Sequence, residues 1–66
     1  MRQKLLEAMQ SSLQGRVDYH RMNVEVYLTN PVGIGEHPDI MEAIESELGK
    51  LAEAEEKLQT LNQFFD

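Results

Sequence analysis

The sequence predicts an all-α protein, an antiparallel two-helix hairpin that pairs with a second copy to form a dimeric four-helix bundle. Three observations predict this fold. Apolar residues recur at steps of three and four in both halves of the 66-residue chain, which is the period of a helix with one apolar face. Both prolines and two of the four glycines lie between these halves, in the segment "NPVGIGEHPD". The two apolar series are also similar in length, so one helix can lie along the other.

The first helix is expected over about residues 2–29. Its apolar series consists of Leu6, Met9, Leu13, Val17, Val24 and Leu28, with His20 in the gap. Two features oppose one continuous helix. Gly15 lies in the middle and costs about 1 kcal/mol relative to alanine, and "NVEVYLT" (residues 23–29) alternates as a β-strand does. A break at Gly15 and a strand over 23–29 both stay open, although no second alternating segment could pair with such a strand.

A corner is expected over residues 30–37. Asn30 precedes a proline and is therefore pushed out of the helical region, and Pro31 cannot continue a helix. Gly33 and Gly35 supply backbone freedom. Pro38 suits the first turn of a new helix, where its missing N–H is not needed.

The second helix is expected over about residues 38–64, a stretch rich in Glu, Ala, Leu, Lys and Gln. Its apolar series consists of Met41, Ile44, Leu48, Leu51, Ala54, Leu58, Leu61 and Phe65. If the chain turns back around Ile34, residue i faces about residue 68 − i of the other helix. Leu6 then meets Leu61, and His20 meets Leu48. The whole chain, residues 1–66, is predicted to be this single hairpin domain.

A lone hairpin leaves further apolar positions uncovered beside both series. The candidate interface residues are Leu5, Tyr19, Met22, Val26, Ile40 and Phe64. The chain has no cysteine, so disulfides cannot stabilise it, and chains of this size often oligomerise instead. A homo-oligomer is therefore expected, with a dimer favoured.

The charge balance excludes some partners. Twelve acidic and six basic residues give a net charge of −6, and no basic patch is present to offset phosphate repulsion, so nucleic acid is not an expected partner. Residues 1–30 hold four basic and three acidic residues, whereas residues 31–66 hold two basic and nine acidic ones. No apolar run could span a membrane, and the expected location is the cytoplasm.

No catalytic, cofactor-binding or metal site is predicted. Gly33 and Gly35 precede a helix start, as in phosphate-binding loops, but Pro38 stands where the dinucleotide fingerprint needs a third glycine. Glu36, His37 and Asp39 are weak metal candidates, because divalent metal sites normally use more ligands than these three.

His20 lies on the apolar series and could act as a base, but no orienting partner or pocket is recognisable in the sequence. It is interpreted as a hydrogen-bonded residue at the boundary of the helix contact. An alternative makes it a pH-sensitive polar position that sets the packing register.

The segment "VEVYLTNPVGIGEHPDIMEAIESELGKLAEAEEKLQTLNQFF" resembles small uncharacterised proteins of tailed phages that infect marine cyanobacteria. The resemblance covers about residues 24–65, and "NPVGIGEHPDI" is its most distinctive part. It implies a phage accessory protein that acts in the host bacterial cytoplasm, and it carries over no functional residue.

These observations favour a small, acidic, non-enzymatic interaction module that oligomerises through its helices and docks on a host or phage protein. The alternative is a structural or assembly component of a virion. A metal- or nucleotide-dependent enzyme that uses the loop of residues 33–39 is less favoured.

Overall fold

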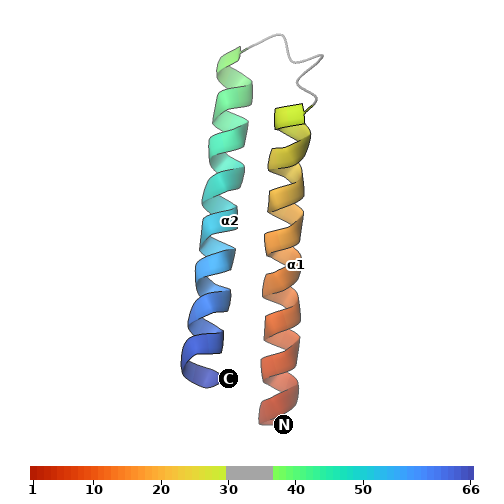
Figure 1. Cartoon of the computed structure of the whole chain (residues 1–66), viewed down its shortest axis with the longest axis vertical. Helices are drawn as coiled ribbons and strands as arrows, with labels where there is room; N and C mark the ends of the chain where they lie inside the picture. Colours follow the sequence, from red (N-terminus) through yellow and green to blue (C-terminus); the bar gives the residue numbers. More distant parts are fainter. Residues whose placement is uncertain (30–36) are drawn as a thin grey trace.

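The computed structural model describes residues 1–29 and 37–66, which form two long helices (Figure 1). Helix α1 spans Arg2–Thr29 and helix α2 spans His37–Phe65. They lie side by side and antiparallel, with both chain ends at the same end of the rod. There the Arg2 Nη2 group donates a hydrogen bond to the Phe65 carbonyl oxygen at 2.6 Å. The prediction of two helices that pack against each other as an all-α hairpin is confirmed.

Helix α1 is continuous through both positions that the sequence left open. Gly15 lies inside it, and residues 23–29 form its last two turns. A strand would need a neighbouring strand for its hydrogen bonds, and residues 1–29 and 37–66 contain none. The contact that α1 makes with α2 along its length outweighs the cost of one glycine.

Helix α2 begins at His37, one residue earlier than expected. Pro38 is its second residue, and Asp39 lies in its first turn, where a negative charge is favoured by the helix dipole. The other predicted corner residues, Asn30, Pro31, Gly33 and Gly35, lie outside the described residues.

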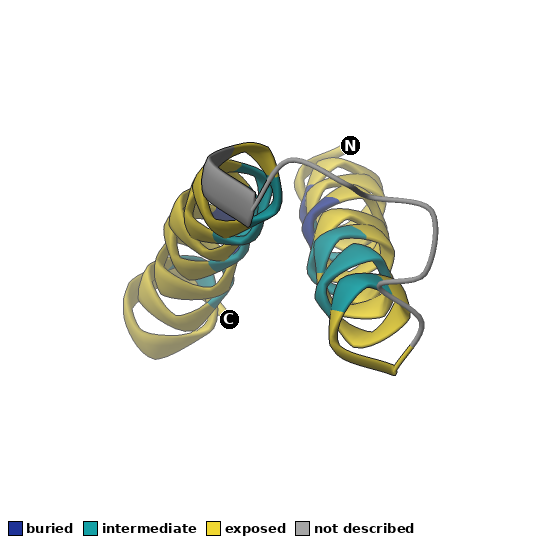
Figure 2. Cartoon of the chain, turned by 90° about the horizontal axis from the view of Figure 1, so that it is seen from above, coloured by how far each residue is buried: buried dark blue, intermediate teal, exposed yellow. Residues whose placement is uncertain are grey.

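The core of the hairpin is thin. In the described part of the chain the buried apolar residues are Leu6, Leu13 and Ala54, with exposed fractions of 8%, 3% and 3%. Half-buried residues continue the contact along both helices (Figure 2). The predicted contact residues among them are Val17, His20, Val24, Ile44, Leu51, Leu58 and Leu61.

Five predicted contact residues are instead exposed: Met9, Leu28, Met41, Leu48 and Phe65. The half-buried residues that the sequence series missed are Gln10, Asn23, Tyr27, Ile40, Ala43 and Glu47. The reason is the repeat. The apolar series of the first helix recurs on average about every 3.7 residues. Two long helices that stay in contact instead need a contact residue about every 3.5 residues. The true contact therefore recurs every seven residues, as at Leu6, Leu13, His20 and Tyr27.

The molecule is a rod of 50 × 15 × 14 Å with a radius of gyration of 15.1 Å. A compact domain of this length has a radius of gyration of about 11 Å. Each helix therefore covers only one side of the other and leaves its remaining sides to solvent.

Neither helix of the described chain has a stretch apolar enough to cross a membrane.

Candidate functional site

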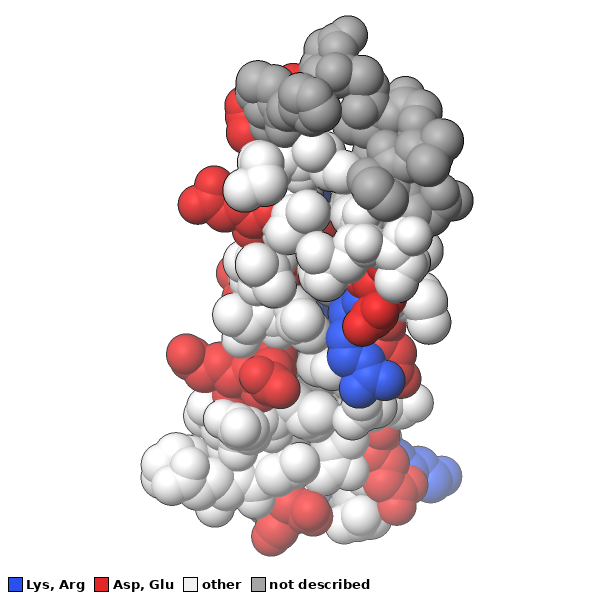
Figure 3. Space-filling model, turned by 45° about the horizontal axis from the view of Figure 1, so that its top comes forward, with Lys and Arg blue, Asp and Glu red and all other residues white. Residues whose placement is uncertain are grey.

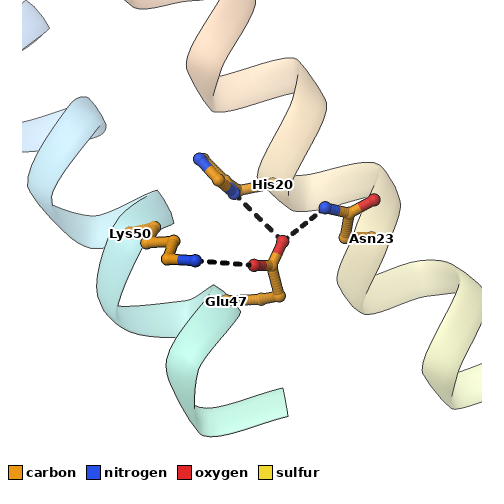
Figure 4. Close-up of polar contacts among 4 residues, drawn as sticks. All are labelled: His20, Asn23, Glu47 and Lys50. Atoms are coloured by element: carbon orange, nitrogen blue, oxygen red, sulfur yellow. Dashed lines mark hydrogen bonds and ion pairs between the residues drawn. The ribbon is translucent and has the colours of Figure 1, made fainter. Parts of the chain in front are cut away.

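A polar cluster joins the two helices near the middle of the rod (Figure 4). The His20 Nδ1 group donates a hydrogen bond to Glu47 Oε1 at 3.0 Å, and the Asn23 side-chain amide donates to the same oxygen. Lys50 lies one turn along α2, with its Nζ atom 3.7 Å from the other carboxylate oxygen, Oε2. The cluster thus links one turn of α1 to one turn of α2.

The Glu47 carboxylate is partly buried. Its side chain is 12% exposed and that of His20 is 15% exposed, whereas Lys50 is largely in solvent. The hydrogen bond from His20, followed by that from Asn23, lowers the pKa of Glu47 below its ordinary value of 4.5. Partial burial works in the opposite direction but is outweighed. The carboxylate therefore stays charged and tied to α1 around neutral pH.

The cluster lies apart from the three grooves of the rod that are described below, because none of them is lined by any of its members. No group of three or more metal-ligating side chains occurs among the described residues. The geometry of the cluster fixes how α1 and α2 are aligned, since a shift of one turn would separate Glu47 from His20 and Asn23.

One edge of the hairpin is an apolar groove near the chain ends. A hollow of about 590 Å³ is lined by Met1, Arg2, Leu5, Leu6, Met9, Leu61 and Phe65. A second hollow of about 600 Å³ shares Met9, Leu61 and Phe65 with it and extends toward Arg16 and Lys57. Together they form an open apolar surface rather than an enclosed pocket.

The opposite edge is polar. Its hollow of about 500 Å³ is lined by Glu7, Gln10, Ser11, Gln14, Leu58, Asn62 and Asp66. Here the Gln10 side-chain amide donates to Asn62 Oδ1 at 2.9 Å across the helix contact. The two edges of the rod therefore differ in character, and apolar surface is concentrated on one of them.

The charges are also unevenly spread. On the face shown in Figure 3, acidic side chains run down the α2 side of the rod, whereas the α1 side carries both basic and acidic side chains. The exposed acids of α2 outside the polar cluster are Asp39, Glu42, Glu45, Glu53, Glu55 and Glu56.

Most candidate interface residues lie on the surface. Leu5, Tyr19, Met22, Val26 and Phe64 are exposed, whereas Ile40 is half-buried. Of the weak metal candidates, Asp39 is exposed, Glu36 lies outside the described residues, and the side chain of His37 is likewise not described.

Sequence reasoning placed His20 on the helix contact but missed its partners. Counting back in steps of seven from Leu61 and Ala54 leads to Glu47 and then to Ile40, and this repeat would have found the buried acid. The apolar series could not, because it stepped to Leu48 instead.

A comparison with known proteins finds no matching family model, no matching curated protein and no matching solved structure.

Proposed function

We propose that this chain is a small non-enzymatic protein-interaction module that works as a helical homo-dimer. The observation that carries the proposal is the amount of uncovered surface. The hairpin exposes 5204 Å², whereas a folded monomer of 7.6 kDa is expected to expose about 4,300 Å². The excess of about 900 Å² is close to the ~800 Å² that each partner contributes to a standard protein–protein interface.

The thin core supports the same proposal. Leu6, Leu13 and Ala54 are a small set of buried residues for two helices of 28 and 29 residues. Two-layer helical domains gain their stability from apolar burial, and a second copy is a ready source of more of it.

We further propose that the dimer docks on a host or phage protein in the bacterial cytoplasm, the setting that the resemblance to cyanophage proteins implies. The exposed acids of α2 suit a basic surface on that partner. Affinity capture from infected and uninfected host cells tests this step. The proposal is supported if one protein is captured by the wild-type chain and is no longer captured when Glu53, Glu55 and Glu56 are changed to Gln. Capture that survives this change contradicts an acidic docking face.

Self-association is tested by measuring solution mass across a dilution series. The expected result is a dimer at high concentration that dissociates on dilution into monomers of 7.6 kDa. A monomer at every concentration would contradict the proposal.

A further inference from the structure

We propose that the two copies meet through the outer face of α1, antiparallel, about a two-fold axis that passes close to Gly15 and Arg16. This inference rests on the proposed self-association and specifies its geometry. The face in question, called here the outer strip, is formed by exposed residues at helical spacing on α1. It continues from the apolar edge of the hairpin, where Met1 and Leu5 line the groove. Its members are Met1, Leu5, Ala8, Ser12, Gly15, Tyr19, Met22 and Val26.

The outer strip carries no charged residue along the whole length of α1. All of its members are exposed in the single chain, including the large side chains of Leu5, Tyr19 and Met22. A helix face that stays in water normally carries charged and polar residues. The matching outward face of α2 does so, because it holds Asp39, Glu42, Glu53 and Glu56. The outer strip therefore has the composition of a covered face.

Four members of the strip, Leu5, Ser12, Tyr19 and Val26, also match one another when one copy of α1 is reversed. Helix α1 spans Arg2–Thr29, so its midpoint falls between Gly15 and Arg16. A two-fold axis at this point brings Leu5 to the level of Val26 of the other copy. Met9, which borders the strip, comes to the level of Met22, and small Ser12 comes to the level of large Tyr19. In a two-fold interface every contact occurs twice, so each of these residue pairs forms at both ends of the helix pair.

Gly15 supplies an independent observation. A Cβ atom added to Gly15 would meet nothing within 4 Å in the described part of the chain. Packing within the hairpin therefore gives no reason for a residue that weakens the helix. A second helix that crosses the strip at Gly15 does give one, because the missing side chain lets two backbones approach closely. Ala8 and Ser12 keep the neighbouring turns small as well.

The charges favour this arrangement over contact through α2. Helix α2 holds seven acidic and two basic residues, whereas α1 holds four basic and three acidic ones. Two α2 helices in contact would repel each other, while two α1 helices are nearly neutral. The result is a four-helix assembly with the two α1 helices in the middle and the acidic α2 helices outside.

The first test uses introduced cysteines, because the natural chain has none. Leu5 and Val26 are 21 residues apart, which is about 31 Å along a helix. Leu5→Cys alone and Val26→Cys alone should therefore give little disulfide-linked dimer, whereas a mixture of the two variants should give a mixed disulfide efficiently. Efficient cross-linking of each variant with itself would mean a parallel dimer and overturn the two-fold arrangement proposed here.

The second test compares two leucines that α1 exposes equally. Leu5 and Leu28 are each 62% exposed, but Leu28 lies off the outer strip. Leu5→Gln should raise the dimer dissociation constant by about tenfold, whereas Leu28→Gln should leave it unchanged.

The outcomes separate this inference from the proposed function. If wild type is a dimer and Leu5→Gln dimerises as tightly as Leu28→Gln does, the outer strip is not the interface although self-association stands. If wild type is monomeric at every concentration, both proposals fall. A wild-type monomer that binds a different protein through the strip would likewise overturn the choice of a second copy.

Discussion

His20 of α1 and Glu47 of α2 are joined across the helix contact by a hydrogen bond of 3.0 Å, from Nδ1 to Oε1. Asn23 donates to the same carboxylate oxygen. A carboxylate that is half-buried with two donors has few equally good positions elsewhere along the contact, because moving it away would leave it without partners. This pair therefore specifies the alignment of the helices more strongly than the apolar residues do, since one apolar residue can replace another.

The polar cluster predicts acid sensitivity. The pKa of Glu47 is lowered in the folded chain, chiefly by the hydrogen bond from His20. A carboxyl group of this kind stabilises the fold fully above its unfolded-state pKa of about 4.5, and the contribution is lost as the pH falls through the lower folded-state pKa. The free energy of unfolding, measured by denaturant titration at fixed protein concentration, should therefore decrease as the pH is lowered below about 4.5.

Glu47→Gln should reduce this loss, because glutamine does not titrate. The matched control is Glu53→Gln, which changes an acid whose side chain is 69% exposed. It should keep the acid-induced loss. Equal pH profiles for wild type and Glu47→Gln would show that other groups govern the acid response.

Leu13 is predicted to be essential for stability. It is 3% exposed, and replacing a buried leucine by alanine costs about 2–5 kcal/mol. In a core this thin, Leu13→Ala should leave the chain largely unfolded at 25 °C, with a marked loss of helical circular dichroism. Leu28→Ala, at a 62% exposed position of the same helix, should change stability by less than about 0.5 kcal/mol.

Replacing Gly15 or Gly49 by alanine is expected to affect helix stability in the same way but dimer affinity differently. A Cβ atom at either position meets nothing within 4 Å in the described chain, so each change to alanine should stabilise its helix by about 1 kcal/mol. Gly49 lies on the acidic outward face of α2, and Gly49→Ala should leave dimerisation unchanged. Gly15→Ala should weaken it, because the added methyl group separates the crossing helices.

Melting curves at low concentration and dissociation constants from sedimentation distinguish these effects. Unchanged dimer affinity in Gly15→Ala would place the helix crossing elsewhere.

Arg16 is predicted to oppose dimerisation slightly. The proposed two-fold axis passes at its level, so the positive charges of the two copies lie nearer to each other in the dimer than in separate chains, although Arg16 itself lies at the edge of the hairpin. Arg16→Gln should tighten the dimer by about twofold, a gain of the size expected for an exposed charge pair. It should also weaken the dependence of the dissociation constant on salt. Arg21→Gln, on another side of α1, is the control, and a looser dimer in Arg16→Gln would indicate that Arg16 contacts an acid instead.

The sequence was sufficient for the two helices and for their antiparallel pairing. Steps of three and four between apolar residues, and the prolines between the two series, determine these features. The facing residues were harder to predict, because the series followed Met41 and Leu48 whereas the structure turns Ile40 and Glu47 inward. Two helices in contact wind around each other, so the residues that face the partner helix recur every seven positions. This repeat decides which residues turn inward, whether or not they are apolar.

The polar cluster could not be predicted from apolar periodicity for the same reason. Asn23 and Glu47 are polar residues at positions that the repeat turns inward, and only their mutual contact makes this acceptable. Gly15 also looked like a helix breaker, although one glycine in a 28-residue helix is a small cost beside the contact that the whole helix makes with α2.

The hydrogen bond between Arg2 and the carbonyl group of Phe65 shows how near the two chain ends come. A short Gly-Ser bridge could join them, and a cut between Thr29 and His37 would then reverse the order of the helices while both stay whole. The pairing of α1 with α2 resides in the side chains that face each other. Such a circular permutant should therefore fold to the same hairpin, although α2 precedes α1 in its sequence.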